Sequence, residues 1–269
     1  MSAPLGPEGR LRGLRVLTTA ASRGIGLAVV RRCALEGAHV ALSASSEESA
    51  ARAVERVVEG APGARVGGLA LDVRDASSIA AGVGRARALL GGVDALFLNV
   101  PGASPGGLAD LGEGAWQDAF SLYILSVLRL VGALAPDLEA ARPGRVVVVT
   151  SFVAMEALPG LTLSNVLRPA VHALVREVAR DLGPRGVLMN AVAPGRVDTD
   201  RVRAVDERAG RARGVGAAAV RAEAEAAVPL GRYADPDELA RAVVFLLSRE
   251  NTYVTGQCLL VDGGLVRSP

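Results

Sequence analysis

Lysine is absent from this sequence of 269 residues, and all 30 of its basic residues are arginine. The uniform choice of arginine is typical of a biased coding sequence rather than of thirty separate functional requirements. It also excludes chemistry that depends on a lysine amine, because a guanidinium group does not deprotonate near neutral pH.

Aromatic residues are scarce, at 3% of the chain, although 50% of the residues are hydrophobic. The core must therefore be built from Ala, Val and Leu, as expected of a parallel sheet that helices bury on both faces. A net charge of only +2 gives no electrostatic reason to bind nucleic acid or an anionic membrane. The expected partner is a small-molecule substrate.

Cysteine and histidine are also rare, with two of each. Cys33 and Cys258 lie in segments with helix and strand patterns, so we expect free, buried thiols, although the pair also permits a disulfide. With only His39 and His172 available, we expect no metal site. Met1–Gly13 lacks the apolar core of a signal peptide, and no apolar run is expected to span a membrane. We therefore expect a cytoplasmic protein.

Short apolar runs alternate with helical patterns along most of the chain. The alternation predicts an α/β fold, a doubly wound parallel sheet of the Rossmann type with right-handed crossovers, in a single domain. The domain covers 14–269 after a flexible N-terminal segment, 1–13, and the Ala/Arg/Glu-rich stretch 200–228 is expected to form one or two surface helices as a substrate lid. The predicted strands are Arg15–Thr19, His39–Ser43, Val66–Leu71, Ala95–Leu98, Arg145–Thr150, Val187–Val192 and Cys258–Val261. The predicted helices are Ile25–Glu36, Glu47–Glu59, Ser77–Leu90, Ala115–Leu138, Ala170–Leu182 and Asp235–Leu247, the last capped by Asp235.

A turn containing glycine follows the first predicted strand, over Thr19–Gly26. Glycine lets the backbone approach a pyrophosphate, and the start of the next helix supplies free N–H groups and a positive dipole end. One such turn is weak evidence alone, but its place after the first strand of a βαβ unit strengthens it.

Several motifs in the right order make the sequence resemble the short-chain dehydrogenase/reductase family. The first turn resembles the family's Thr-Gly-x-x-x-Gly-x-Gly, with Ala20 replacing the first glycine. Asp72-Val73 resembles the pair that contacts adenine, 99–102 the Asn-Asn-Ala-Gly segment, and Pro194-Gly195 the turn near the nicotinamide, while 229–264 resembles the C-terminal region. The resemblance covers 14–266. It implies a nucleotide site formed by Ala20, Ser22, Arg23, Gly24, Ile25, Gly26, Ser45, Asp72, Val73, Asn99, Gly102, Pro194, Gly195, Val197 and Thr199.

The end of the second predicted strand bears on which nucleotide is preferred. NAD sites usually place an acid there to bind the ribose hydroxyls, but this strand ends in Leu42-Ser43-Ala44-Ser45-Ser46. A 2′-phosphate would meet no repulsion, and Ser45, Ser46 and Arg23 could donate hydrogen bonds to it. The pattern favours NADP(H) over NAD if either binds. Solvated loop side chains explain the same residues equally well.

Three of the four catalytic residues that the resemblance implies differ in this chain. In the family a Tyr donates a proton, a Lys four positions later lowers its pKa and holds the ribose, a Ser orients the substrate oxygen, and an Asn completes a proton path. Ser151 matches the Ser, whereas Ser164 stands at the Tyr position, Arg168 at the Lys position and Tyr123 at the Asn position. Arg168 keeps the positive charge, but the hydroxyl of Ser164 is a weaker and shorter acid than a phenol.

Tyr123 is the candidate for a relocated acid, because Tyr233 and Tyr253 fall in the C-terminal region, where aromatic residues are expected to pack structurally. The alternative is an aromatic residue that fills the space of the missing phenol. Glu156 is either a base or an exposed loop carboxylate, and His172 is expected to be a hydrogen-bonded helix residue without a catalytic role.

Pro169 directly follows the Lys position. Proline lacks an N–H group and disfavours helical geometry in the residue before it. We therefore expect the helix there to start at Pro169 or to kink.

Three functions stay open on the sequence. The first is an atypical NADP(H)-dependent oxidoreductase of secondary metabolism, acting on a carbonyl or hydroxyl of a small, polyketide-like substrate with Ser151, Tyr123, Ser164 and Arg168. The second is a non-redox dehydratase, cyclase or lyase, in which Ser151, Ser164 and Arg168 stabilise an oxyanion. The third is a silent subunit that pairs with an active homologue. Because the C-terminal stretch resembles the family's oligomer-forming segment, we expect a homodimer, a homotetramer or a hetero-oligomer.

Overall fold

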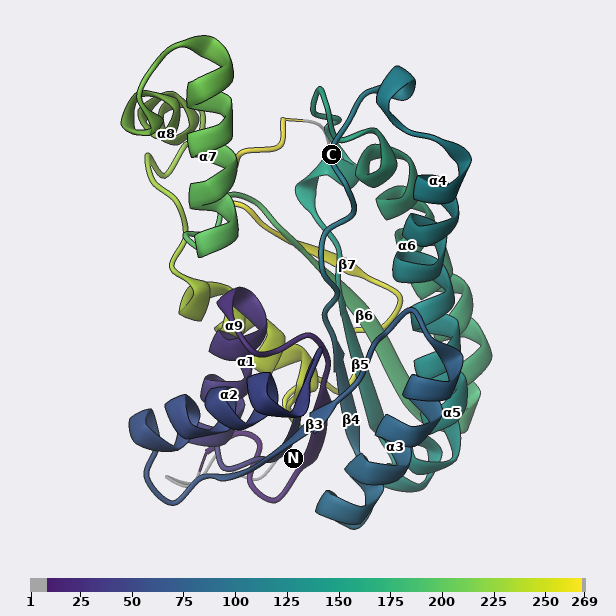
Figure 1. Ribbon diagram of the computed structural model, residues 1–269. Helices are drawn as coiled ribbons and strands as arrows, with labels where there is room; N and C mark the ends of the chain where they lie inside the picture. The colour runs from purple at the N-terminus through teal and green to yellow at the C-terminus, as the bar shows by residue number, and fades with distance from the viewer. Residues whose placement is uncertain (1–8, 268–269) are drawn as a thin grey trace.

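The computed structural model describes residues 9–267, which form a seven-stranded parallel sheet with helices on both faces (Figure 1). The strand order is β3-β2-β1-β4-β5-β6-β7, so the direction of winding reverses between β1 and β4. The predicted doubly wound α/β fold is confirmed. Ligands of such sheets bind beyond the carboxyl ends of the strands at the point of reversal. The strands are β1 Arg15–Thr18, β2 His39–Ala44, β3 Arg65–Ala70, β4 Ala95–Leu98, β5 Gly144–Val149, β6 Val187–Pro194 and β7 Cys258–Val261.

Two layers of helices cover the sheet, and a third group stands apart from them. Helices α1 Gly24–Leu35, α2 Glu47–Gly60 and α9 Pro236–Leu247 pack on one face. Helices α3 Ala76–Leu90, α5 Ser126–Ala141 and α6 Thr162–Leu182 pack on the other, and α4 Glu113–Phe120 runs into α5. Helices α7 Asp200–Arg213 and α8 Ala217–Ala226 form the two surface helices expected of 200–228, and Figure 1 shows them beyond one end of the sheet.

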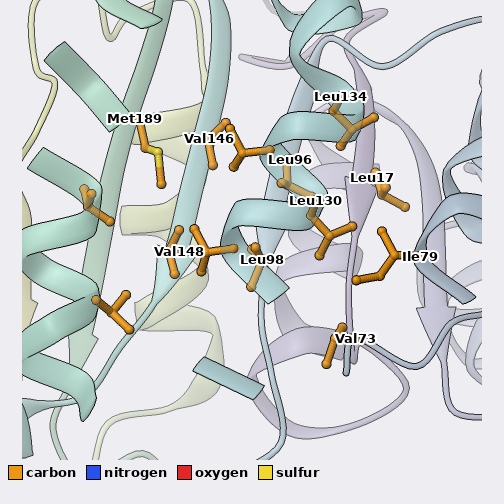
Figure 2. Close-up of a cluster of buried hydrophobic side chains, with 14 of the residues drawn as sticks. Leu17, Val73, Ile79, Leu96, Leu98, Leu130, Leu134, Val146, Val148 and Met189 are labelled. Atoms are coloured by element: carbon orange, nitrogen blue, oxygen red, sulfur yellow. The ribbon is translucent and has the colours of Figure 1, made fainter. Parts of the chain in front are cut away.

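The core is aliphatic, as the composition predicts. Figure 2 shows Leu96 and Val146 of the sheet among Leu130 and Leu134 of α5, all of them fully buried. Burying one such side chain contributes about 1.5–3 kcal/mol to folding. These contacts fix α5 against the sheet and so fix the position of the residues in the turn that precedes it.

The helical stretch Glu113–Ala141 is the one segment among the described residues that is long and apolar enough to cross a membrane, with a mean hydropathy of 1.7 over its most apolar window. Length and composition alone do not distinguish a membrane-spanning helix from a core helix. In the fold this stretch packs along the sheet, with Leu130, Leu134 and Leu138 fully buried, and it has the character of a core helix.

Helix α6 contradicts the prediction of a start at Pro169, because it begins seven residues earlier, at Thr162, and runs through the proline. Leu163 and Leu167 are buried in its first turns, so packing compensates for the hydrogen bond that proline cannot donate. Ser164 and Arg168 therefore lie one helical turn apart on one continuous helix, as the family alignment requires.

Other predictions from the sequence concern the N-terminal segment, the two cysteines and Tyr253. Most of the N-terminal segment expected to be flexible, residues 1–8, lies outside the described residues, whereas Leu11 is buried and donates its N–H to Glu36. Both cysteines are free thiols, Cys33 fully buried and Cys258 partly buried. Tyr253 is 95% exposed, so the expectation that it packs structurally is wrong within this chain.

Candidate active site

Tyr123 lies in a π-helical turn, Ser121–Leu125, that interrupts the helical stretch between α4 and α5. Such turns are rare and occur frequently at functional sites. The ring is 2% exposed. The phenol oxygen accepts a hydrogen bond from the N–H of Ala103 at 2.7 Å and lies 3.3 Å from the hydroxyl of Ser164. The turn therefore places a buried phenol beside Ser164 and Arg168 of α6, the residues at the family's Tyr and Lys positions.

Arg168 stacks on Tyr123, with its guanidinium carbon 4.1 Å from the centre of the ring. The side chain is buried, and Nη1 donates to the carbonyl of Val149 at 2.7 Å. Nε has no hydrogen-bond partner among residues 9–267. A cation over an aromatic face is favourable by about 0.5–2 kcal/mol when it is desolvated, so the two residues hold each other in place.

This arrangement changes the acidity of the phenol. Burial raises the pKa of Tyr123, but the charge of Arg168 and the hydrogen bonds from Ser164 and Ala103 outweigh burial and lower the pKa from its ordinary value of 10.0. A buried phenol with a lowered pKa is a suitable proton donor near neutral pH.

Ser151 lies two residues beyond Val149, the residue that anchors Arg168. Its oxygen accepts a hydrogen bond from the N–H of Val153 at 3.4 Å and so caps the short 3₁₀ turn Phe152–Ala154. The side chain is half-buried. This bond uses the oxygen as an acceptor and leaves the hydroxyl hydrogen free to donate to a substrate oxygen.

The glycine-containing turn joins β1 to α1 at the point of strand reversal. Ala20 has a positive φ of 46°, which shows the strain expected when alanine replaces the family's first glycine. A methyl group at Gly26 would lie 2.6 Å from the Cα of Ala21, so only glycine fits there. The amide of Asn99 donates to the carbonyl of Ala20 at 3.0 Å and ties this turn to the loop after β4.

The residues expected around a 2′-phosphate lie at the end of β2 and in the first turn. Ser45 and Arg23 are exposed, and Ser46 caps α2 by accepting from Ser49. Sequence reasoning missed Arg56 of α2, whose Nη2 donates to the carbonyl of Ser22 at 2.5 Å. No local pattern identifies this contact, because it joins a helix to the turn of the preceding βα unit.

The other residues expected to bind the nucleotide follow β3 and β6. These two strands lie on opposite sides of β1 and β4 in the sheet. Asp72 pairs with Arg74, and Val73 is buried in the core. Pro194 ends β6, and Val197 is buried. Thr199 caps α7, and its methyl group would lie 3.4 Å from a methyl group added at Gly24. The structure thus brings the Pro194–Thr199 turn to the Gly24 turn, as the resemblance implies, with Ile25 and Gly195 on the same two turns.

Glu156 and His172 differ in their surroundings. Glu156 is exposed and accepts a weak hydrogen bond from the N–H of Arg267 at 3.4 Å, which agrees with a loop carboxylate. His172 Nε2 lies 2.9 Å from the hydroxyl of Thr150 and 3.2 Å from the sulfur of Cys258. Burial, with the nearby charge of Arg176, lowers the pKa of His172 to about 4. It is a neutral, hydrogen-bonded histidine.

Arg201, in the first turn of α7, is a second residue that sequence reasoning missed. A methyl group at Gly102 would lie 1.8 Å from Nη2 of Arg201, so the guanidinium group rests directly on this glycine of the loop after β4. The position of Arg201 could have indicated this contact, because it lies two residues after Thr199, at the start of the segment expected to cover the site.

Comparison with known proteins identifies the family of this chain. Residues 19–266 match the family model described as enoyl-(acyl carrier protein) reductase. The 3-oxoacyl-[acyl-carrier-protein] reductase of Vibrio harveyi is 33% identical over 255 residues, which are 95% of this chain and 98% of the relative.

Two solved structures share nearly the whole fold. L-sorbose reductase of Gluconobacter frateurii, complexed with NADPH and L-sorbose, superimposes with a TM-score of 0.91 at 27% identity and covers 98% of this chain and 100% of its own. A short chain oxidoreductase of Pseudomonas aeruginosa PAO1, bound to NADPH and described as containing an atypical catalytic center, has a TM-score of 0.87 at 31% identity and covers 96% of this chain and 99% of its own. With the reversal between β1 and β4 and the ordered motifs around it, these matches show that the chain belongs to the short-chain dehydrogenase/reductase family of oxidoreductases.

Proposed function

We propose that this protein is an atypical NADP(H)-dependent oxidoreductase that interconverts a carbonyl and a hydroxyl group of a small organic substrate, with Tyr123 as the proton donor. The observation that carries the proposal is the phenol of Tyr123, which is buried under the guanidinium group of Arg168 and hydrogen-bonded to Ser164. A polyketide-like ketone is part of the proposal as the substrate expected from the sequence.

The residues at the point of strand reversal fit a dinucleotide. Gly26 stands where any side chain would collide with the turn. The first turn of α1 contains no acid, and no side chain of the described residues caps it, so its N–H groups and positive dipole end favour a phosphate. NADP(H), when bound, would supply the hydride chemistry. The basic side chains of Arg23 and Arg56 and the lack of an acid at Ala44 support NADP(H) over NAD.

The chain's own residues would then manage the proton. During reduction, the phenol of Tyr123 donates its proton to the substrate oxygen, and Ser151 donates a hydrogen bond to the same oxygen. Arg168 stabilises the phenolate that results, because its charge lies over the ring. Ser164, 3.3 Å away, would relay a proton from solvent to the phenolate, because a hydroxyl group can give up its own hydrogen while it accepts another. Each reduction consumes one hydride and one proton and yields one alcohol.

Titration with NADPH and NADH is the first test, by calorimetry or by nucleotide fluorescence. We expect micromolar binding of NADPH and at least tenfold weaker binding of NADH. Ser45→Asp places a carboxylate one residue after Ala44, the position where NAD enzymes carry an acid, and should reverse the preference, because a carboxylate repels the 2′-phosphate. A chain that binds neither nucleotide would refute the redox function and leave a non-redox enzyme or a silent subunit. Binding should be followed by consumption of NADPH with a panel of ketones.

We also propose a homodimer or homotetramer, with pairing to an active homologue as the alternative. Two exposed apolar surfaces support assembly. One is an open groove between α4 and α6, lined in part by Trp116, Phe120, Leu125 and Leu167. The other is at the edge strand β7, where Leu259 is exposed, together with Tyr253 in the segment before it. Light scattering after size-exclusion chromatography should give two or four copies. A monomer at micromolar concentration would contradict the proposal.

A further inference from the structure

Arg201 contacts the loop after β4, the same loop that donates a hydrogen bond to the phenol of Tyr123. Its guanidinium group rests on Gly102, and the next residue, Ala103, donates its N–H to the phenol oxygen of Tyr123. The phosphate-binding turn approaches the N-cap of α7 two residues earlier, where Thr199 lies beside Gly24. A substrate whose carbonyl meets Tyr123 would therefore lie close to Arg201.

Arg201 and Arg168 are two positively charged side chains that lie close to each other in the site. The charge of Arg201 contributes to lowering the pKa of the buried Arg168, so the two guanidinium groups repel each other. Among residues 9–267 no hydrogen bond or ion pair joins either of them to an acid. Arg203, in the same turn of α7, pairs with both Asp198 and Asp200. The acids nearest in sequence are therefore already engaged, and an anion from a ligand would relieve the repulsion.

We propose that Arg201 binds a carboxylate of the substrate, so that the protein acts on an oxo acid rather than on a neutral ketone; this rests on the proposed function. A guanidinium group offers a planar pair of N–H donors that match the two oxygens of a carboxylate. Arg168 cannot take this role, because it is buried against Tyr123 and bonded to Val149. Arg201 is exposed, and its side chain can meet a ligand that enters from solvent.

The test compares each oxo acid with its neutral ester. The pairs are 3-oxobutanoate with its ethyl ester and 4-oxopentanoate with its methyl ester, each assayed for NADPH consumption with the wild type, Arg201→Gln and Arg203→Gln. We expect kcat/KM for at least one acid to exceed that for its ester by tenfold or more. The ratio should fall at least tenfold in Arg201→Gln, because a hydrogen-bonded charge is lost. It should not change in Arg203→Gln, which removes a charge of the same kind from the same turn.

Two results would overturn the proposal. One is an acid-to-ester ratio in Arg201→Gln equal to that of the wild type. The other is a loss of NADPH affinity in Arg201→Gln with no change in the ratio, which would assign Arg201 to the nucleotide phosphates.

A wild-type chain that consumes no NADPH with these four substrates leaves the proposed function to the nucleotide titration but still tests Arg201. In that case 4-oxopentanoate is titrated by calorimetry into all three proteins. Binding that Arg201→Gln abolishes and Arg203→Gln keeps supports the carboxylate site. Absence of binding to the wild type refutes it.

Discussion

Replacing Tyr123 with phenylalanine removes one oxygen atom and keeps the ring under Arg168. The variant loses the acid and the hydrogen bonds to Ala103 and Ser164. Loss of a positioned general acid lowers a rate by about 10²–10⁴-fold, so we expect kcat/KM for ketone reduction to fall by that factor. The affinity for NADPH should stay within threefold, because the lost oxygen faces the loop after β4 and α6 rather than the phosphate-binding turn.

The pH dependence separates loss of the acid from loss of structure. Reduction needs the protonated phenol, so kcat/KM of the wild type should decline as pH rises through the pKa of Tyr123, which the fold holds below 10.0. In the opposite direction, alcohol oxidation needs the phenolate and should rise over the same range. Tyr123→Phe should show neither the decline in reduction nor the rise in oxidation over this pH range.

The free energy of unfolding provides the control for Tyr123→Phe. The N–H of Ala103 loses its partner, which costs about 1–3 kcal/mol in the free energy of unfolding. Tyr233→Phe is the matched control, because Tyr233 is also buried and loses a hydrogen bond, to Asp206. Urea unfolding should show a similar loss in both variants, whereas only Tyr123→Phe should lose activity. Full reductase activity in Tyr123→Phe would remove the phenol from the mechanism and leave it as a residue that fills space.

Three further changes test the fold around the site. Ala20→Gly should raise the free energy of unfolding by about 0.5–1 kcal/mol in urea titrations, because the positive φ of 46° suits glycine; a destabilised variant would contradict the strain. Gly26→Ala should weaken NADPH binding and lower stability by about 1–3 kcal/mol, because its methyl group would lie 2.6 Å from Ala21; unchanged calorimetry and unfolding would show that the turn adapts. For His172, whose pKa is lowered to about 4, protonation of the unfolded chain should reduce stability between about pH 6.5 and pH 4, by about 1–2 kcal/mol after allowing for its partial exposure. That loss should be absent in His172→Gln, as measured by urea unfolding across the same pH range.

The sequence predicted the sheet well because each buried strand is a short apolar run, and such runs can be recognised one at a time. Asp235 is confirmed as the cap of α9, with Pro236 in its first turn, since caps are also local signals. The start of α6 was wrong because a local rule for Pro169 competed with the burial of Leu163 and Leu167, which depends on the sheet beneath. Arg56 and Arg201 were missed for the same reason, because their contacts join distant segments.

The three residues that depart from the family pattern are better understood as one unit than as separate losses. The stacked position of Arg168 needs an aromatic face, and Tyr123 supplies it at 4.1 Å. The phenol oxygen needs room beside α6, and the small side chain of Ser164 leaves that room while adding a hydrogen bond at 3.3 Å. A tyrosine at position 164 would place a larger side chain where Ser164 now lies 3.3 Å from the Tyr123 hydroxyl. Coding bias accounts for arginine in place of lysine, but it does not account for a phenol that moves from α6 to the π-helical turn and keeps its cation. The contacts among all three positions support the proposal that the site is rearranged rather than silent.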